Sequence, residues 1–177
     1  MTLRRSTLCC LVLGILLALV GCASEPARQP PPTAVSTNQP KTTQITSPLP
    51  DSAFKAELNP IDPPTKMRTG EKQVVQVTVR NTSPNLWPAL GEADGKFAIT
   101  LRNRWLDSNG KKVINDLDGG TILPEDLPAG GNVNLTITVT APKTPGQYQL
   151  EFDMVQEQVN FFHDRGSQPA DVNISVE

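Results

Sequence analysis

Residues 132–140, Asn-Val-Asn-Leu-Thr-Ile-Thr-Val-Thr, and residues 146–154, Gly-Gln-Tyr-Gln-Leu-Glu-Phe-Asp-Met, decide the fold. In both runs apolar residues alternate with polar ones. The apolar positions are Val133, Leu135, Ile137 and Val139 in the first run and Tyr148, Leu150, Phe152 and Met154 in the second. A side-chain period of two is typical of a strand with one face on a core. The two runs therefore predict half-buried strands of an antiparallel sheet.

The same alternation continues on both sides of these runs. It recurs in four further segments, 54–58, 75–79, 97–101 and 172–176, of which the first is the weakest. Trp105 keeps the phase of Ile99 and Leu101, so we expect its side chain to point into the core. Trp87 lies between strands and is expected to cap one end of the fold.

Turn residues separate the strands. Ser108-Asn109-Gly110 predicts a hairpin, because Asn-Gly accepts the positive φ that tight hairpins need. About seven strands without helical periodicity predict an all-β fold, a single immunoglobulin-like antiparallel β-sandwich over residues 51–177. Within it, Tyr148 after Pro145-Gly146 fits a tyrosine corner, in which the hydroxyl binds upstream backbone.

The N-terminus has the pattern of a secretory signal. Arg4 and Arg5 precede an apolar run over residues 8–20, too short for a bilayer-spanning helix of about 20 residues. Leu19-Val20-Gly21-Cys22 resembles the lipobox of bacterial lipoprotein precursors. The resemblance implies a signal peptide over 1–21, lipidation of Cys22, and a lipid membrane as partner. Ala23 after the cysteine implies the outer membrane in a Gram-negative cell. The alternatives are that Cys22 is a core residue or that residues 8–20 remain as a helical anchor.

Residues 22–50 predict the lipidated cysteine followed by a disordered linker. The stretch 23–50 is rich in proline, threonine, serine and glutamine, and it cannot bury enough apolar area to offset the entropy of ordering. Prolines favour extended conformations, so we expect a tether that holds the sandwich away from the lipid surface.

Composition argues against several functions. The sequence has 16 basic and 18 acidic residues, and removal of the signal peptide with Arg4 and Arg5 leaves 14 basic and 18 acidic residues. The sequence has no basic patch of the kind that binds nucleic acid. His163 is the only histidine and Cys22 the only cysteine outside the signal peptide, so no Cys–His pair can form. We expect a non-catalytic protein without cofactor or metal. Glu151 and Asp153 share a strand face and are interpreted as solvated acidic residues rather than as a catalytic carboxylate pair.

Two further features leave alternatives open. A calcium site is the alternative interpretation of four acidic residues, Asp116, Asp118, Glu125 and Asp126, although they lack EF-hand spacing. The candidate ligand-binding segment is Phe161, Phe162, His163, Asp164 and Arg165. Adjacent aromatics in an extended chain face opposite sides, so we expect one phenylalanine in the core and the other at the surface beside polar side chains.

An ordered series of short motifs carries a second resemblance. It runs through Arg104-Trp105-Leu106-Asp107, Asn109-Gly110, Leu123-Pro124, Leu127-Pro128-Ala129-Gly130, Ala141-Pro142, Pro145-Gly146-Gln147-Tyr148-Gln149-Leu150, Met154-Val155-Gln156-Glu157 and Phe161-Phe162. Over residues 73–177 the series resembles the β-sandwich attached to O-antigen export ATPases and to some bacterial glycosyltransferases and methyltransferases. In the export ATPases that domain binds the exported polysaccharide.

The expected function is therefore a membrane-anchored lipoprotein whose non-catalytic sandwich binds envelope or extracellular polysaccharide. The alternative is a structural or accessory lipoprotein of the cell envelope that docks a protein partner.

Overall fold

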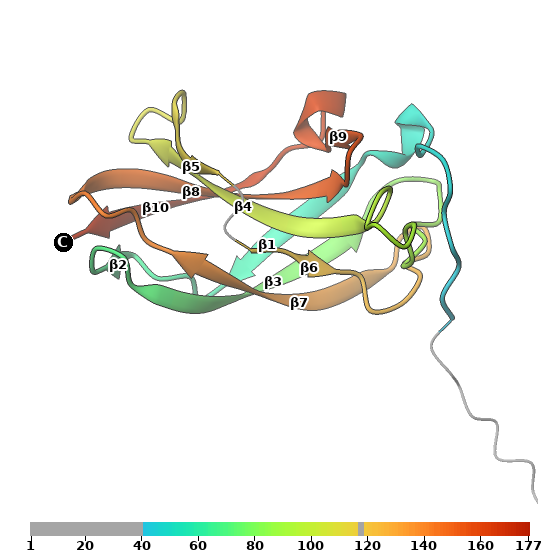
Figure 1. Ribbon diagram of the computed structural model, residues 1–177, viewed down its shortest axis with the longest axis horizontal. Helices are drawn as coiled ribbons and strands as arrows, with labels where there is room; N and C mark the ends of the chain where they lie inside the picture. Colours follow the sequence, from blue (N-terminus) through green and yellow to red (C-terminus); the bar gives the residue numbers. More distant parts are fainter. Residues whose placement is uncertain (1–40, 117–118) are drawn as a thin grey trace, which may run out of the picture. The chain divides into compact units, whose positions relative to one another are not determined.

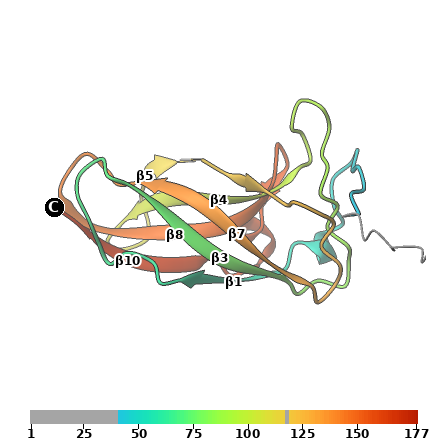
Figure 2. The ribbon, with the colours of Figure 1, turned by 90° about the horizontal axis from the view of Figure 1, so that it is seen from below.

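The computed structural model describes residues 41–116 and 119–177, which form two β-sheets packed face to face (Figures 1 and 2). The smaller sheet has the order β1 (Ala56–Ile61), β3 (Lys72–Asn81), β7 (Asn132–Thr140). The larger has the order β2 (Lys66–Met67), β10 (Ala170–Val176), β8 (Gly146–Gln156), β4 (Ile99–Asp107), β5 (Val113–Asp116), with β6 (Thr121–Ile122) on β4 and β9 (Asn160–Phe161) on β8. The described residues form an all-β, immunoglobulin-like sandwich, as predicted.

The core lies between the sheets and follows the predicted alternation. It receives Val75, Val77 and Val79 from β3, Leu135, Ile137 and Val139 from β7, and Leu150, Phe152 and Met154 from β8, all of them buried. Trp105 on β4 is fully buried as well. Burial of each large apolar side chain contributes about 1.5–3 kcal/mol, so this shared interior is the main source of stability.

The predicted turns are confirmed with one difference in detail. In the β4–β5 hairpin Gly110 takes the positive φ, 67°, and the Asp107 carboxylate accepts hydrogen bonds from the N–H groups of Asn109 and Lys111. The Asp107 N–H donates to Lys112 O at 2.9 Å, so the turn spans residues 108–111 and is wider than a two-residue loop. The tyrosine corner is also present, because the Tyr148 hydroxyl donates to Thr144 O at 2.9 Å.

Two predicted strand residues lie outside the strands. Phe97 precedes β4 and has a φ of 65°, and Phe54 follows the 3-10 turn η1 (Asp51–Ala53). Both side chains are buried nonetheless. Trp87 caps this end of the sandwich as expected: it is fully buried, and its indole N–H donates to Ala53 O at 2.8 Å.

The folded region begins earlier than the sequence predicts. Residues 41–50, assigned above to the linker, form a strap that packs on the sandwich. The Ile45 N–H donates to Leu90 O at 2.8 Å, and the Thr43 N–H donates to Asp126 Oδ1 at 2.7 Å. Leu49 is buried, and its N–H donates to the side chain of Gln156. The composition argument missed the strap because the groups that hold it, the Leu90 carbonyl and the side chains of Asp126 and Gln156, are distant in sequence, and because Leu49 and Ile45 pack on a core that other segments supply.

The remaining N-terminal predictions concern residues that the structure does not describe. The signal peptide 1–21, the lipidation site Cys22 and linker residues 23–40 all lie outside the described ranges. Within those ranges, no helix has both the length and the apolar character needed to cross a membrane.

Candidate functional site

Strand β8 is buried on its outer face as well as on its inner face. Glu151, Asp153 and Val155 point away from the core, yet each is less than 8% exposed. Beyond β8 the chain turns back and pairs with the end of β8 through β9, and the 3-10 turn η2 (His163–Arg165) then places His163 against Asp153 (Figure 1). The prediction that Glu151 and Asp153 are solvated is therefore wrong, because strand alternation gives the direction of a side chain but not what covers it.

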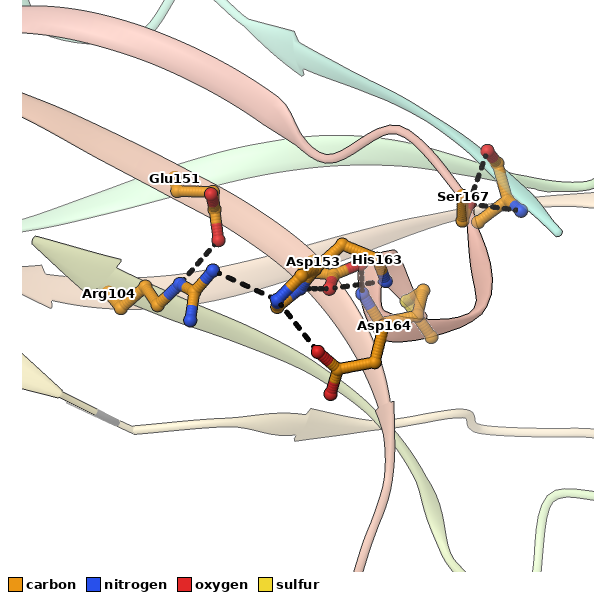
Figure 3. A network of polar contacts seen from close by, with 8 residues as sticks. Arg104, Glu151, Asp153, His163, Asp164 and Ser167 are labelled. Carbon is orange, nitrogen blue, oxygen red and sulfur yellow. Dashed lines mark hydrogen bonds and ion pairs between the residues drawn. The ribbon is translucent and has the colours of Figure 1, made fainter. Parts of the chain in front are cut away.

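Arg104 from the neighbouring strand β4 is the hub of this outer face (Figure 3). Its Nε donates to Glu151 Oε1 at 2.5 Å, and its Nη2 lies 3.1 Å from His163 Nε2. Opposite charges on directly paired residues of adjacent strands explain the first contact, since Arg104 and Glu151 are register partners. The second contact ties the sheet to η2.

Asp153 binds both the ring and the backbone N–H of His163. Its Oδ2 lies 2.6 Å from His163 Nδ1 and accepts a hydrogen bond from the His163 N–H at 3.1 Å. A guanidinium can only donate, so neutral His163 must accept from Arg104 at Nε2 and carry its proton on Nδ1. The ring is thus fixed in one tautomer and one orientation. Asp164 Oδ1 lies 3.3 Å from the same Nε2, on the other side from Asp153.

Burial and hydrogen bonding compete at Asp153. Burial raises the pKa of this carboxyl, and the hydrogen bonds from the His163 ring and backbone oppose the shift without cancelling it. Burial also raises the pKa of Asp171, the register partner of Glu151, and the nearby Glu151 carboxylate adds to the increase. Negative charge is therefore concentrated on this face, with Arg104 as its central cation.

The two adjacent phenylalanines divide as expected. Phe162 is fully buried and packs on Phe54 and Trp87, with ring centroids 5.0 and 5.1 Å apart. Phe161 is partly exposed on the outer face, where the Arg104 guanidinium lies 5.2 Å from its ring centroid and His163 flanks it. Only Phe161 of the pair can therefore touch a ligand.

The other predicted site residues also separate. Asp164 is half exposed beside His163, whereas Arg165 faces η1, where its Nη1 donates to Asp51 Oδ1 at 2.9 Å. The structure thus brings Phe161, His163 and Asp164 together and adds Arg104, which sequence reasoning missed. The sequence did contain a signal for Arg104. Arg102 and Arg104 alternate with core residues on β4, as Glu151 and Asp153 do on β8, so both pairs were expected on the outer face of the sheet.

Phe161 and Asp164 border a shallow hollow of about 280 Å³, which Val155 and Glu157 also line. Arg104 and His163 lie behind Phe161 and are not part of its lining. It offers a flat apolar ring beside hydrogen-bonding groups whose directions are fixed by the network. Such a surface has the chemistry to bind a polar ligand.

The calcium alternative gains no support from the described residues. Asp126 accepts hydrogen bonds from Thr43 and from the Ala89 N–H, so its oxygens serve the strap. Asp118 lies outside the described ranges. Among the described residues, no three acidic, histidine or cysteine side chains gather as a metal-binding group.

Comparisons with known proteins give no family for this chain. No family model matches it, and no curated protein does either. Among solved structures, a β-glucosidase from Listeria innocua in complex with isofagomine is similar over 69% of this chain, with 16% identity and a TM-score of 0.43. The chain spans only 16% of that enzyme's length. A CARDB domain from Pyrococcus furiosus is similar over 69% of this chain and 94% of its own length, with 14% identity and a TM-score of 0.41.

Proposed function

We propose that this protein is a lipid-anchored envelope lipoprotein whose sandwich is a non-catalytic module for polysaccharide. The observation that carries the binding role is Phe161, a partly exposed ring with Arg104 on one side and His163 and Asp164 beside it. An exposed aromatic is costly without a partner, and here its polar neighbours are already held in place.

Sugar rings suit this surface on chemical grounds. A pyranose has an apolar C–H face that can cover a phenyl ring, and a rim of hydroxyls that can both donate and accept. Arg104 supplies donors, Asp164 supplies acceptors, and neutral His163 is oriented by Asp153. Because the network fixes these groups before a ligand arrives, binding costs less ordering entropy.

The anchor part of the proposal rests on Leu19-Val20-Gly21-Cys22. Labelling cells with radioactive palmitate tests it. Cys22→Ala should lose the label and leave an uncleaved precursor, whereas Cys9→Ala, a matched change inside the apolar run, should keep the label. Wild-type labelling of Cys22→Ala would exclude Cys22 as the lipid site.

Affinity columns test the binding role with the full chain in detergent. The columns carry the O-chain released from lipopolysaccharide, peptidoglycan glycan strands, dextran and alginate. We expect at least one column to retain the wild type and Phe161→Ala to bind it severalfold more weakly, since a ligand would cover the part of this ring that is still exposed. Val74→Ala is the control, because Val74 is 70% exposed on the smaller sheet.

Failure of every column to retain the wild type would overturn the binding role. Equal retention of the Phe161→Ala variant would show that this surface is not the site. In the first case the docking of a protein partner becomes the better account of the tethered sandwich.

A further inference from the structure

Phe161 is one end of a row of side chains that crosses the larger sheet. Phe161 on β9 pairs with Val155 on β8, Val155 pairs with Thr100 on β4, and Thr100 pairs with Ile122 on β6. Directly paired residues lie on the same face of a sheet, so all four share the outer face. Val155 and Thr100 form a buried floor between partly exposed Phe161 and Ile122, which is 54% exposed.

A second hollow lies at the Ile122 end of this row. Its volume is about 250 Å³, and its lining includes Asp94, Thr100, Arg102, Ile122 and Glu157. It shares Glu157 and Gln158 with the hollow beside Phe161. The two hollows are therefore neighbours along one face rather than separate sites.

An ion pair crosses the row above Thr100. Arg102 Nε donates to Glu157 Oε1 at 2.8 Å, and Arg102 Nη1 donates to Gly119 O at 3.0 Å. Gly120 makes room for this arrangement, because a Cβ there would lie 2.8 Å from Arg102 Nη1. The pair thus presents a donor and an acceptor side by side in fixed positions, an arrangement suited to adjacent hydroxyls on a sugar ring.

Thr100 contributes a hydroxyl that the fold leaves without a partner. The residue is 3% exposed, and its Oγ1 makes no hydrogen bond with the described protein groups. Leaving a buried hydroxyl unsatisfied costs stability, so such a group requires an explanation. Because Thr100 lines the second hollow, its hydroxyl is available to hydrogen-bond a ligand bound there.

We propose that the second hollow is a further sugar subsite, so that the ligand is an internal stretch of a linear polysaccharide lying across the strands. This inference rests on the proposed function. Three strand spacings separate Phe161 from Ile122, about 14 Å in all, which is more than one sugar ring can span. Phe161 and Ile122 contact the apolar faces of different sugar units, and the Arg102–Glu157 pair binds the hydroxyls between them.

The first test is a pair of variants of the full chain, measured on the column that retains the wild type. Ile122→Ser should weaken binding about tenfold without lowering stability, because its side chain is already exposed. Leu90→Ser, a matched change at a side chain that is 48% exposed on a loop, should leave binding unchanged. Thr100→Val should weaken binding about fivefold while the protein becomes more stable, a combination that a purely structural role would not give.

The second test varies the length of the ligand. Oligosaccharides of one to six sugars, made by partial hydrolysis of the retaining polysaccharide, should compete more strongly as length increases to at least three. Equal competition by single sugars, or unchanged binding by Ile122→Ser while Phe161→Ala loses it, would overturn the second subsite and leave the proposed function intact. Retention of the wild type by no column, or equal retention of Phe161→Ala, would overturn the proposed function at this surface and the second subsite with it.

Discussion

Strand β8 is buried on both faces, and the two faces are built from opposite chemistry. The inner face carries Leu150, Phe152 and Met154, which pack without hydrogen bonds in the shared core. The outer face carries Glu151 and Asp153, and each of them depends on a particular partner, Arg104 and His163. Apolar side chains accept many neighbours, whereas a buried carboxylate needs a donor at one position and in one direction.

The difference bears on what each face is for. Burial of the inner residues supplies stability directly. A buried ion pair is weak support for stability, because the cost of removing both charges from water offsets most of their attraction. The outer face therefore contributes mainly to the positioning of side chains, because it fixes Arg104 and His163 around Phe161. Removing one partner of the Arg104–Glu151 pair should lower the stability of the fold, because the other charge is then buried without a partner.

The largest expected effect separates Phe162, which points into the core, from Phe161, the last residue of β9, which lies on the outer face. Phe162→Ala should reduce the free energy of unfolding by about 3–5 kcal/mol, because a fully buried ring leaves a cavity beside Phe54 and Trp87. Phe161→Ala should cost about 1 kcal/mol or less. Urea unfolding measures both. Similar losses for the two variants would mean that Phe161 belongs to the core.

A smaller effect tests the ionic face alone. Arg104→Met should cost about 3 kcal/mol, because it leaves the Glu151 carboxylate buried without its cation. The double variant Arg104→Met with Glu151→Leu should recover most of that loss, since no unpaired charge remains. The free energies of unfolding of the two single variants and the double variant form a cycle. A double variant as unstable as Arg104→Met would show that the pair itself, rather than the uncompensated charge, stabilises the fold.

The smallest expected effect is a dependence on pH that differs between two buried aspartates. Burial raises the pKa of Asp153 above its ordinary value of 3.8, so its contribution to stability is present below that value and is lost as pH rises through the folded-state pKa. At Asp126 burial also raises the pKa, but hydrogen bonds from Thr43 and Ala89 outweigh it and lower the pKa overall. The contribution of Asp126 to stability is therefore present above pH 3.8 and is lost as pH falls through its folded-state pKa.

Unfolding measured from pH 3 to 7 tests the contrast. The stability of the wild type relative to Asp153→Asn should fall as pH rises, and its stability relative to Asp126→Asn should rise. If both stability differences changed with pH in the same direction, burial would not be the dominant influence on the pKa of Asp153, or hydrogen bonding would not be the dominant influence on that of Asp126.

The sequence was sufficient for the inner face of the sandwich. A period of two is a local property, so the core positions of β3, β7 and β8 follow from their own segments. The split between Phe161 and Phe162 followed for the same reason. The outer network was beyond local reasoning, because Arg104 and Glu151 are 47 residues apart and meet only through strand register. The same holds for the strap, whose partner Asp126 lies 83 residues from Thr43.

The strap also has a mechanical consequence. The described chain enters at one end of the long axis of the sandwich and the C-terminus lies at the other (Figure 1). Tension applied from the N-terminal side therefore loads the Thr43–Asp126 contacts before it reaches any strand of either sheet. When these bonds and those of Ile45 and Leu49 part, residues 41–50 can straighten to a total span of at most about 33 Å, which relieves the load. If the proposed lipid anchor is present, a domain attached in this way can yield to shear and remain folded.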